Sequence, residues 1–102
     1  MSTLRTDMLK RDDGEMSLYV WEPEGTPTAA VLVIQEIFGV NHHIRDMADR
    51  FAAQGYAVVA PALFDRVSAG IELGYTQDDI GSGRETRMKL NDGQVMLDVE
   101  AA

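Results

Sequence analysis

Glu36 is the residue whose position best suits chemistry. It follows the short apolar run at residues 29–34, which places it at the carboxyl end of a predicted parallel strand. In open α/β sheets, ligands bind outside the carboxyl ends of the strands. Burial there would disfavour the charged form of the carboxylate and raise its pKa, which suits a proton acceptor. The alternative is that Glu36 is an ordinary solvated loop residue.

Other residue types that often do chemistry give weaker signals. His42 and His43 are the only histidines, and because helix neighbours point about 100° apart they cannot converge on one metal ion. We therefore expect them to begin an exposed helix, and we predict no metal site. Arg84 and Arg87 could bind an anionic substrate group, although charges on a weak helix are usually just solvated.

Nucleophiles and phosphate loops are missing. The sequence contains no cysteine, and no serine lies in the G-x-S-x-G pattern that presents a hydrolase nucleophile. Neither of the common glycine-rich phosphate-binding patterns occurs. These absences exclude the simplest hydrolase and nucleotide-binding interpretations of the sequence taken by itself.

Composition indicates a globular protein. The 102 residues are 45% hydrophobic and 25% charged, which suits one small domain with a core. A net charge of −8 argues against a nucleic-acid partner and against an anionic membrane surface. No apolar run has the length of a signal peptide or membrane span, so we expect a cytoplasmic protein.

The first two thirds of the sequence predict a hairpin followed by a βαβ unit. Residues 4–21 alternate weakly between polar and apolar side chains around Asp12-Asp13-Gly14, which is typical of two strands joined by a turn. Residues 29–60 contain two apolar runs around a helical pattern that begins at Asn41 and ends at Gly55. The crossover should be right-handed.

The last third is harder to interpret. Residues 61–90 contain four glycines and predict mostly loop, in which Thr76 is able to cap a short helix. Residues 93–102 are good helix formers and predict a second helix.

One stretch resembles a known family. Residues 31–41 read Val-Leu-Val-Ile-Gln-Glu-Ile-Phe-Gly-Val-Asn, and they are followed by Ile-Arg-Asp at 44–46, Gly-Tyr at 55–56 and Pro-Ala-Leu-Phe at 61–64. This combination resembles the dienelactone hydrolase family, from about Met16 to the end of the sequence. The resemblance implies a partial α/β-hydrolase fold of class α/β. Residues 1–102 would form a single incomplete domain, with a hairpin and a βαβ unit of a mostly parallel, incomplete sheet.

The resemblance also implies a chemistry. Family members open lactones or esters through a cysteine nucleophile assisted by aspartate and histidine, without a metal or organic cofactor. Glu36 corresponds to the glutamate that helps to form the thiolate, and the backbone N–H of Ile37 to a donor of the oxyanion hole. Phe38 and Arg84 are the implied substrate-binding residues, Arg84 holding a substrate carboxylate. The implied substrate is a small lactone or ester, whose identity the sequence does not give.

The sequence departs from the family where the nucleophile is concerned. The family's cysteine, aspartate and histidine lie beyond the matching residues, so we expect this chain to be inactive alone. Strand 30–35 would lie between strand 56–60 and a strand that the sequence does not contain, leaving one sheet edge open. We favour an incomplete record as the origin, over a split enzyme completed by a C-terminal half or a truncated product with another role.

Two other functions compete with a hydrolase. The first is a non-catalytic module that uses its open edge to self-associate or to bind a partner. The second is a flavodoxin-like signalling domain, which the pattern from Gln35 to Gly39 fits poorly.

Overall fold

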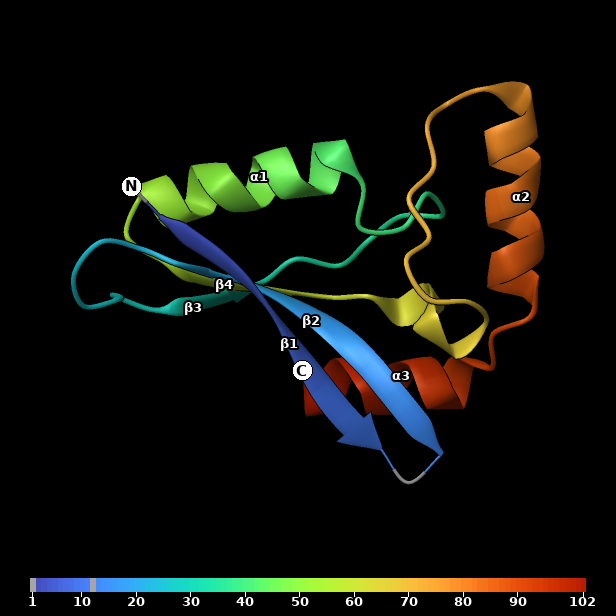
Figure 1. Cartoon of the computed structure of the whole chain (residues 1–102), viewed down its shortest axis with the longest axis horizontal. Helices are drawn as coiled ribbons and strands as arrows, with labels where there is room; N and C mark the ends of the chain where they lie inside the picture. Colours follow the sequence, from blue (N-terminus) through green and yellow to red (C-terminus); the bar gives the residue numbers. More distant parts are fainter. Residues whose placement is uncertain (1, 12) are drawn as a thin grey trace.

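The computed structural model describes residues 2–11 and 13–102 of the chain. Within them, four strands form one mixed sheet (Figure 1). The strands are β1 (Thr3–Arg11), β2 (Gly14–Glu22), β3 (Ala30–Leu32) and β4 (Ala57–Pro61). The predicted hairpin is therefore confirmed as β1 and β2, although Asp12 of the predicted turn lies outside the described residues.

The strand order is β1-β2-β4-β3, with β3 at one edge. β2 pairs antiparallel with both β1 and β4, and only β3 and β4 pair in parallel within the part of the chain that the structure describes. The prediction of a mostly parallel sheet is thus wrong for these residues. The reason is that the hairpin joins β4 directly, so that antiparallel pairing extends to the centre of the sheet.

Helix α1 (His42–Ala53) connects the two parallel strands as predicted. The Asn41 side chain caps it by accepting a hydrogen bond from the backbone N–H of Ile44, at 3.4 Å. After the helix, Gly55 adopts a φ of +94°, a conformation that glycine tolerates best. One face of α1 is buried and joins a core built from both the helix and the sheet. That core contains Trp21, Val33, Val40, Ile44, Ala48, Ala52, Val58, Ala60 and Ala62.

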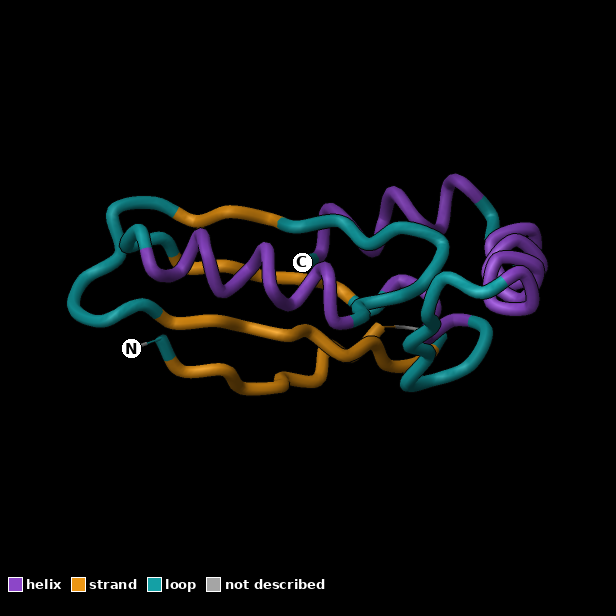
Figure 2. Tube along the Cα trace, turned by 90° about the horizontal axis from the view of Figure 1, so that it is seen from above, coloured by secondary structure: helices purple, strands orange, loops and turns teal. Residues whose placement is uncertain are grey.

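The region after β4 is more helical than the sequence predicts. It contains a 3₁₀ turn, η1 (Leu63–Arg66), and the helices α2 (Gln77–Met88) and α3 (Asp92–Ala101). The cap by Thr76 is confirmed, because its side chain accepts from the backbone N–H of Asp79 at 3.1 Å. α1 and α3 lie on opposite sides of the sheet, and α2 stands across its end (Figures 1 and 2).

A buried ionic cluster ties α3 to the rest of the molecule. Asp98 has a side chain only 1% exposed, and it accepts two hydrogen bonds from Arg66, at 2.7 and 3.0 Å. Arg11 of β1 donates a third, at 3.0 Å. Arg66 also bonds Asp13, which holds the pKa of that carboxyl below its usual value. A side chain from each of β1, η1 and α3 therefore meets in this cluster.

The β3 edge lacks a neighbouring strand among the described residues. β3 is shorter than the predicted strand 30–35, although the N–H of Val33 still donates to the carbonyl of Val59 at 2.9 Å. The side chains of Leu32 and Ile34 are 40% and 43% exposed. The predicted open edge is thus confirmed, and it presents apolar side chains to solvent. Across residues 2–11 and 13–102, no helix combines the length and the apolar character needed to cross a membrane.

Candidate functional site

Residues 36–39 form a tight turn beyond the carboxyl end of β3, called here the Glu36–Gly39 turn. The N–H of Gly39 donates to the carbonyl of Glu36 at 3.2 Å, which closes the turn. Glu36 therefore lies where the sequence predicts it. Its side chain is exposed, however, so the burial expected for this carboxylate is absent in this chain. The strand before it, β3, has no neighbour on its outer side among the described residues.

The turn leaves backbone donors unpaired. The N–H groups of Ile37 and Phe38 donate to no acceptor within the described residues. Ile37 as a whole residue is half-buried. An unpaired backbone N–H of this kind is able to stabilise a developing oxyanion.

A second segment, residues 71–75, packs against the turn. The N–H of Leu73 donates to the carbonyl of Phe38 at 2.8 Å. The buried side chain of Asn41 donates to the carbonyl of Leu73 at 3.0 Å and to the hydroxyl of Tyr75 at 3.3 Å. Phe38 packs edge-on against the ring of Tyr75, with centroids 4.6 Å apart. Asn41 thus both caps α1 and holds the segment that supports the turn.

A hollow of about 210 Å³ lies beside the turn. It is lined by Ile34, Gln35, Glu36, Ile37, Leu63, Phe64, Arg87, Leu90 and Val95. Glu36 and Ile37 therefore both line this hollow. Phe38 and Arg84, the predicted substrate-binding residues, are not among the lining residues.

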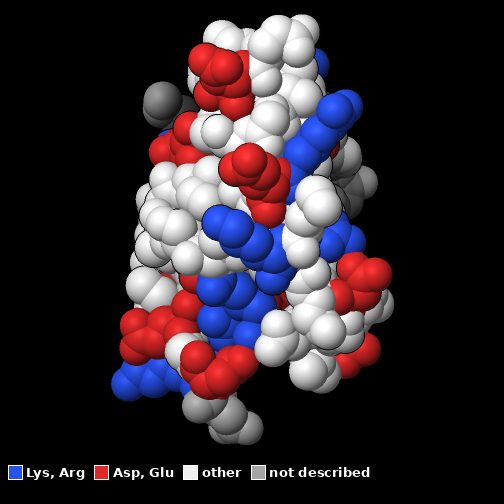
Figure 3. All heavy atoms as spheres, turned by 90° about the vertical axis from the view of Figure 1, so that its right-hand side faces the viewer, with Lys and Arg blue, Asp and Glu red and all other residues white. Residues whose placement is uncertain are grey.

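The cation at the hollow is Arg87, one helical turn beyond Arg84. Its guanidinium donates to Asp92 at 2.6 Å, which leaves other donors of its fork for a ligand. Arg84 is exposed on α2, and its guanidinium makes no hydrogen bond or ion pair within the described residues. Figure 3 shows basic side chains gathered in the middle of this end of the molecule, with acidic ones around them. The spacing of three residues in the sequence does not reveal which arginine faces the hollow.

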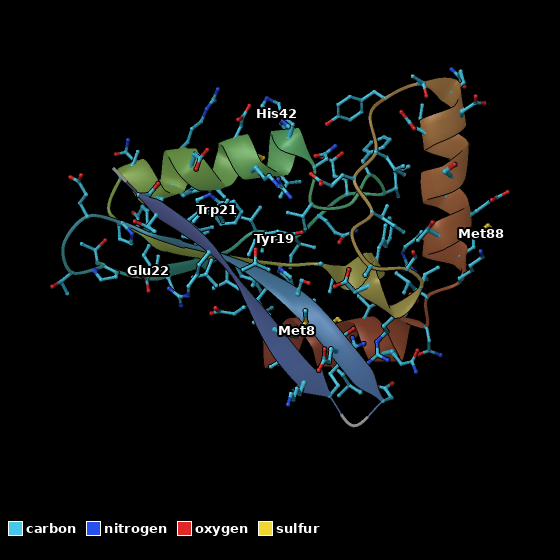
Figure 4. All side chains as sticks on the ribbon, in the orientation of Figure 1. Met8, Tyr19, Trp21, Glu22, His42 and Met88 are labelled. Atoms are coloured by element: carbon cyan, nitrogen blue, oxygen red, sulfur yellow. The ribbon has the colours of Figure 1, made fainter. Side chains whose placement is uncertain are left out.

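The histidines play no part in this site. Both are exposed at the start of α1, and the His42 side chain, 91% exposed, lies 3.2 Å from Asp46 (Figure 4). The prediction of an exposed helix start is confirmed. Within residues 2–11 and 13–102, no group of three or more His, Cys, Asp or Glu side chains is arranged to hold a metal ion.

Helix α2 touches the turn through a glycine. A Cβ atom at Gly83 would overlap the carbonyl oxygen of Ile37, whereas a Cβ at Gly81 would meet nothing within 4 Å. Gly83 therefore permits a close approach between α2 and the backbone that follows Glu36.

We expect opposite effects from alanine at these two glycines. Gly81→Ala should raise the free energy of unfolding by about 0.5–1 kcal/mol, because alanine favours a helix interior. Gly83→Ala should lower it by about 1 kcal/mol, because overpacking outweighs the same gain. Urea unfolding followed by far-UV circular dichroism would measure both. Equal stabilisation by the two variants would show that α2 does not rest on Ile37.

Comparisons with known proteins agree with this arrangement. The model of the Dienelactone hydrolase family matches residues 16–102. A curated relative from Synechocystis sp., named "Putative carboxymethylenebutenolidase", is 46% identical over 71 residues, which are 70% of this chain and 29% of the relative. A relative of the same name from Methylorubrum extorquens is 41% identical over 91 residues, covering 88% of this chain and 30% of the relative. The chain thus spans less than a third of either protein.

A solved structure extends the match to the fold. The crystal structure of a "Putative Dienelactone Hydrolase" from Klebsiella pneumoniae superposes with a TM-score of 0.79 at 30% identity. The match covers 99% of this chain and 42% of the Klebsiella chain. The Glu36–Gly39 turn, the βαβ unit and the helices after it therefore occur within one shared fold. The family model spans most of the sequence, including this turn, and the chain belongs to the dienelactone hydrolase family.

Proposed function

We propose that this chain supplies two parts of the active site of a lactone or ester hydrolase. The Glu36 carboxylate would help to form a cysteine thiolate, and the N–H of Ile37 would stabilise the oxyanion. The observation that carries this proposal is the position of the Glu36–Gly39 turn. It lies beside a hollow of about 210 Å³, at the end of a strand that has no neighbour on its outer edge in the described part of the chain.

The free edge of β3 gives the missing nucleophile a place. By family resemblance, the cysteine lies on the turn after the next strand, and a strand added to β3 would end close to Glu36. A thiolate there would attack the substrate carbonyl to form a thioester, and the carbon–oxygen bond to the lactone or ester oxygen would break as that oxygen takes a proton. Water would then hydrolyse the thioester, which releases the acid and returns the thiol. Arg87 is better placed than Arg84 to meet a substrate carboxylate, because Arg87 lines the hollow. Phe38 would act on the substrate only through its packing beside the turn.

The purified chain of 102 residues should be inactive. It contains no cysteine, and a carboxylate with an oxyanion donor cannot replace a nucleophile. We expect p-nitrophenyl acetate to be hydrolysed no faster than in buffer alone. The native chain and the Glu36→Gln variant should give the same rate. Activity that Glu36→Gln abolishes would mean that a different group attacks the ester, and the cysteine mechanism would be withdrawn.

A hybrid protein tests the positive half of the proposal. The chain would be joined to the part of the Synechocystis relative that follows the matching residues. We expect esterase activity, and Glu36→Gln should lower kcat/KM by about 100-fold, the usual scale for losing a proton-transfer group. Glu15→Gln is a matched control, since Glu15 is an exposed glutamate on β2, outside the Glu36–Gly39 turn and residues 71–75. Equal activity of the two variants would remove Glu36 from the mechanism.

A non-catalytic role in association is the second candidate. The observation in its favour is the free β3 edge, where Leu32 and Ile34 are 40% and 43% exposed. Exposed apolar edges favour pairing with another strand. Size-exclusion chromatography of the chain, compared with Leu32→Lys, separates the cases. A defined oligomer of the native chain that becomes monomeric in Leu32→Lys supports this role. If the native chain and the variant are both monomeric, this role is removed.

A further inference from the structure

The side chain of Gln35 joins the carboxyl ends of the two parallel strands. Its Oε1 accepts a hydrogen bond from the backbone N–H of Leu63, just after β4, at 2.8 Å. Its Nε2 donates to the carbonyl oxygen of Glu36 at 3.2 Å. One amide therefore links the segment after β4 to the Glu36–Gly39 turn.

The bond to the Glu36 carbonyl also constrains the next N–H. A trans peptide is planar, and its C=O and N–H point in opposite directions. The Glu36 carbonyl is fixed by two donors, Nε2 of Gln35 and the N–H of Gly39, both at 3.2 Å. The N–H of Ile37 belongs to the same peptide and has no acceptor among the described residues. Its direction is therefore set from the carbonyl side.

We propose that Gln35 is a positioning residue for the Ile37 N–H. The inference rests on the proposed function, in which that N–H stabilises an oxyanion. Such a donor is effective when it is oriented before the reaction begins, so that no reorganisation is needed as charge develops. Gln35 does not touch the reacting atoms in this scheme. It acts by keeping the peptide between Glu36 and Ile37 from rotating.

The Gln35→Glu variant isolates this role. A carboxylate keeps an acceptor for the N–H of Leu63 but has no donor for the carbonyl of Glu36. In ¹⁵N relaxation measurements on the chain, we expect the order parameter of the Ile37 N–H to fall from about 0.85 to below about 0.6. The order parameters along α1 should stay unchanged. Gln77→Glu, the same change at an exposed position, should leave Ile37 as it is.

Gln35→Met removes both hydrogen bonds and keeps the side chain nearly the same size. It replaces Gln35→Glu in the relaxation experiment if the glutamate variant fails to fold. A rigid Ile37 N–H in whichever variant folds would overturn the inference. The hybrid enzyme gives the second readout, in which Gln35→Glu should lower kcat about tenfold with KM nearly unchanged. A mobile N–H with unchanged kcat would also overturn it. A hybrid that is inactive in every form would refute the proposed function, while the relaxation data would still decide whether Gln35 holds the peptide.

Discussion

Replacing Asp98 with asparagine should lower the free energy of unfolding by about 3 kcal/mol. Removing one partner of a buried ion pair leaves an uncompensated charge, which typically costs about 3–5 kcal/mol. Here two guanidinium groups are affected, because Arg66 and Arg11 both bond this carboxylate and are each only 11% exposed. We take the lower end of the range because Asp13 remains as a second partner of Arg66.

The matched control for this change is Asp92→Asn on the same helix. Asp92 is 84% exposed and pairs with Arg87 at the surface, where ion pairs contribute at most about 1 kcal/mol. Urea unfolding of both variants, with the m-value compared, gives the two free energies. Similar losses at both positions would show that the cluster around Asp98 is as solvated as the surface pair.

Replacing Gly39 with alanine should destabilise the chain by about 3 kcal/mol. Gly39 has a φ of +79°, where a side chain costs about 1–2 kcal/mol. A Cβ there would also overlap the carbonyl oxygen of Ile71, and relieving such crowding costs about 1–3 kcal/mol. The two costs act together because residues 71–75 are hydrogen-bonded to the Glu36–Gly39 turn, which keeps the two segments from moving apart.

Gly25 provides the control for the backbone term alone. Its φ is +73°, and a Cβ there would meet nothing within 4 Å. Gly25→Ala should therefore cost only about 1 kcal/mol. Thermal unfolding of the two alanine variants measures the difference, which is the contribution of the contact with Ile71. If both variants lose the same stability, residues 71–75 do not press on the turn.

Local patterns predict the elements whose signals are local. α1 has a capping side chain at Asn41, an apolar face and a terminating Gly55, and all three lie within fifteen residues. The β1–β2 hairpin is predictable for the same reason. The strand order could not be derived from composition or periodicity, since nothing in either of them states that β2 pairs with β4.

Tertiary contacts explain what sequence patterns miss. Taken alone, Gly83 predicts a break in the helix. In the structure it lies within α2, where the helix packs so closely against the carbonyl of Ile37 that a Cβ atom would overlap it. Asp98 and Arg11 are 87 positions apart, and no local pattern shows that they meet.

The candidate site was partly predictable. Glu36 and Ile37 follow from a polar residue at the end of an apolar run and from the family resemblance. The choice between Arg84 and Arg87 depends on the rotation of α2 about its axis, which its glycine-rich sequence does not define. The link from Gln35 to Leu63 spans 28 positions and needs the parallel pairing of β3 and β4 to form.

The two edges of the sheet differ in a way that limits how copies of the chain can assemble. β1 carries charged side chains beside its exposed Leu4 and Met8, and its Arg5 pairs with Asp7 and Glu22. The opposite edge exposes Leu32 of β3 and Ile34 just beyond it. Two copies that meet through β3 use the same surface and are related by a two-fold axis. Both β3 edges are then paired, and the β1 edges face outward, where the charged side chains of Arg5 and Asp7 disfavour further pairing and the exposed Leu4 and Met8 do not. A contact between two β3 edges would therefore close on itself, and a larger assembly would need a second contact through β1.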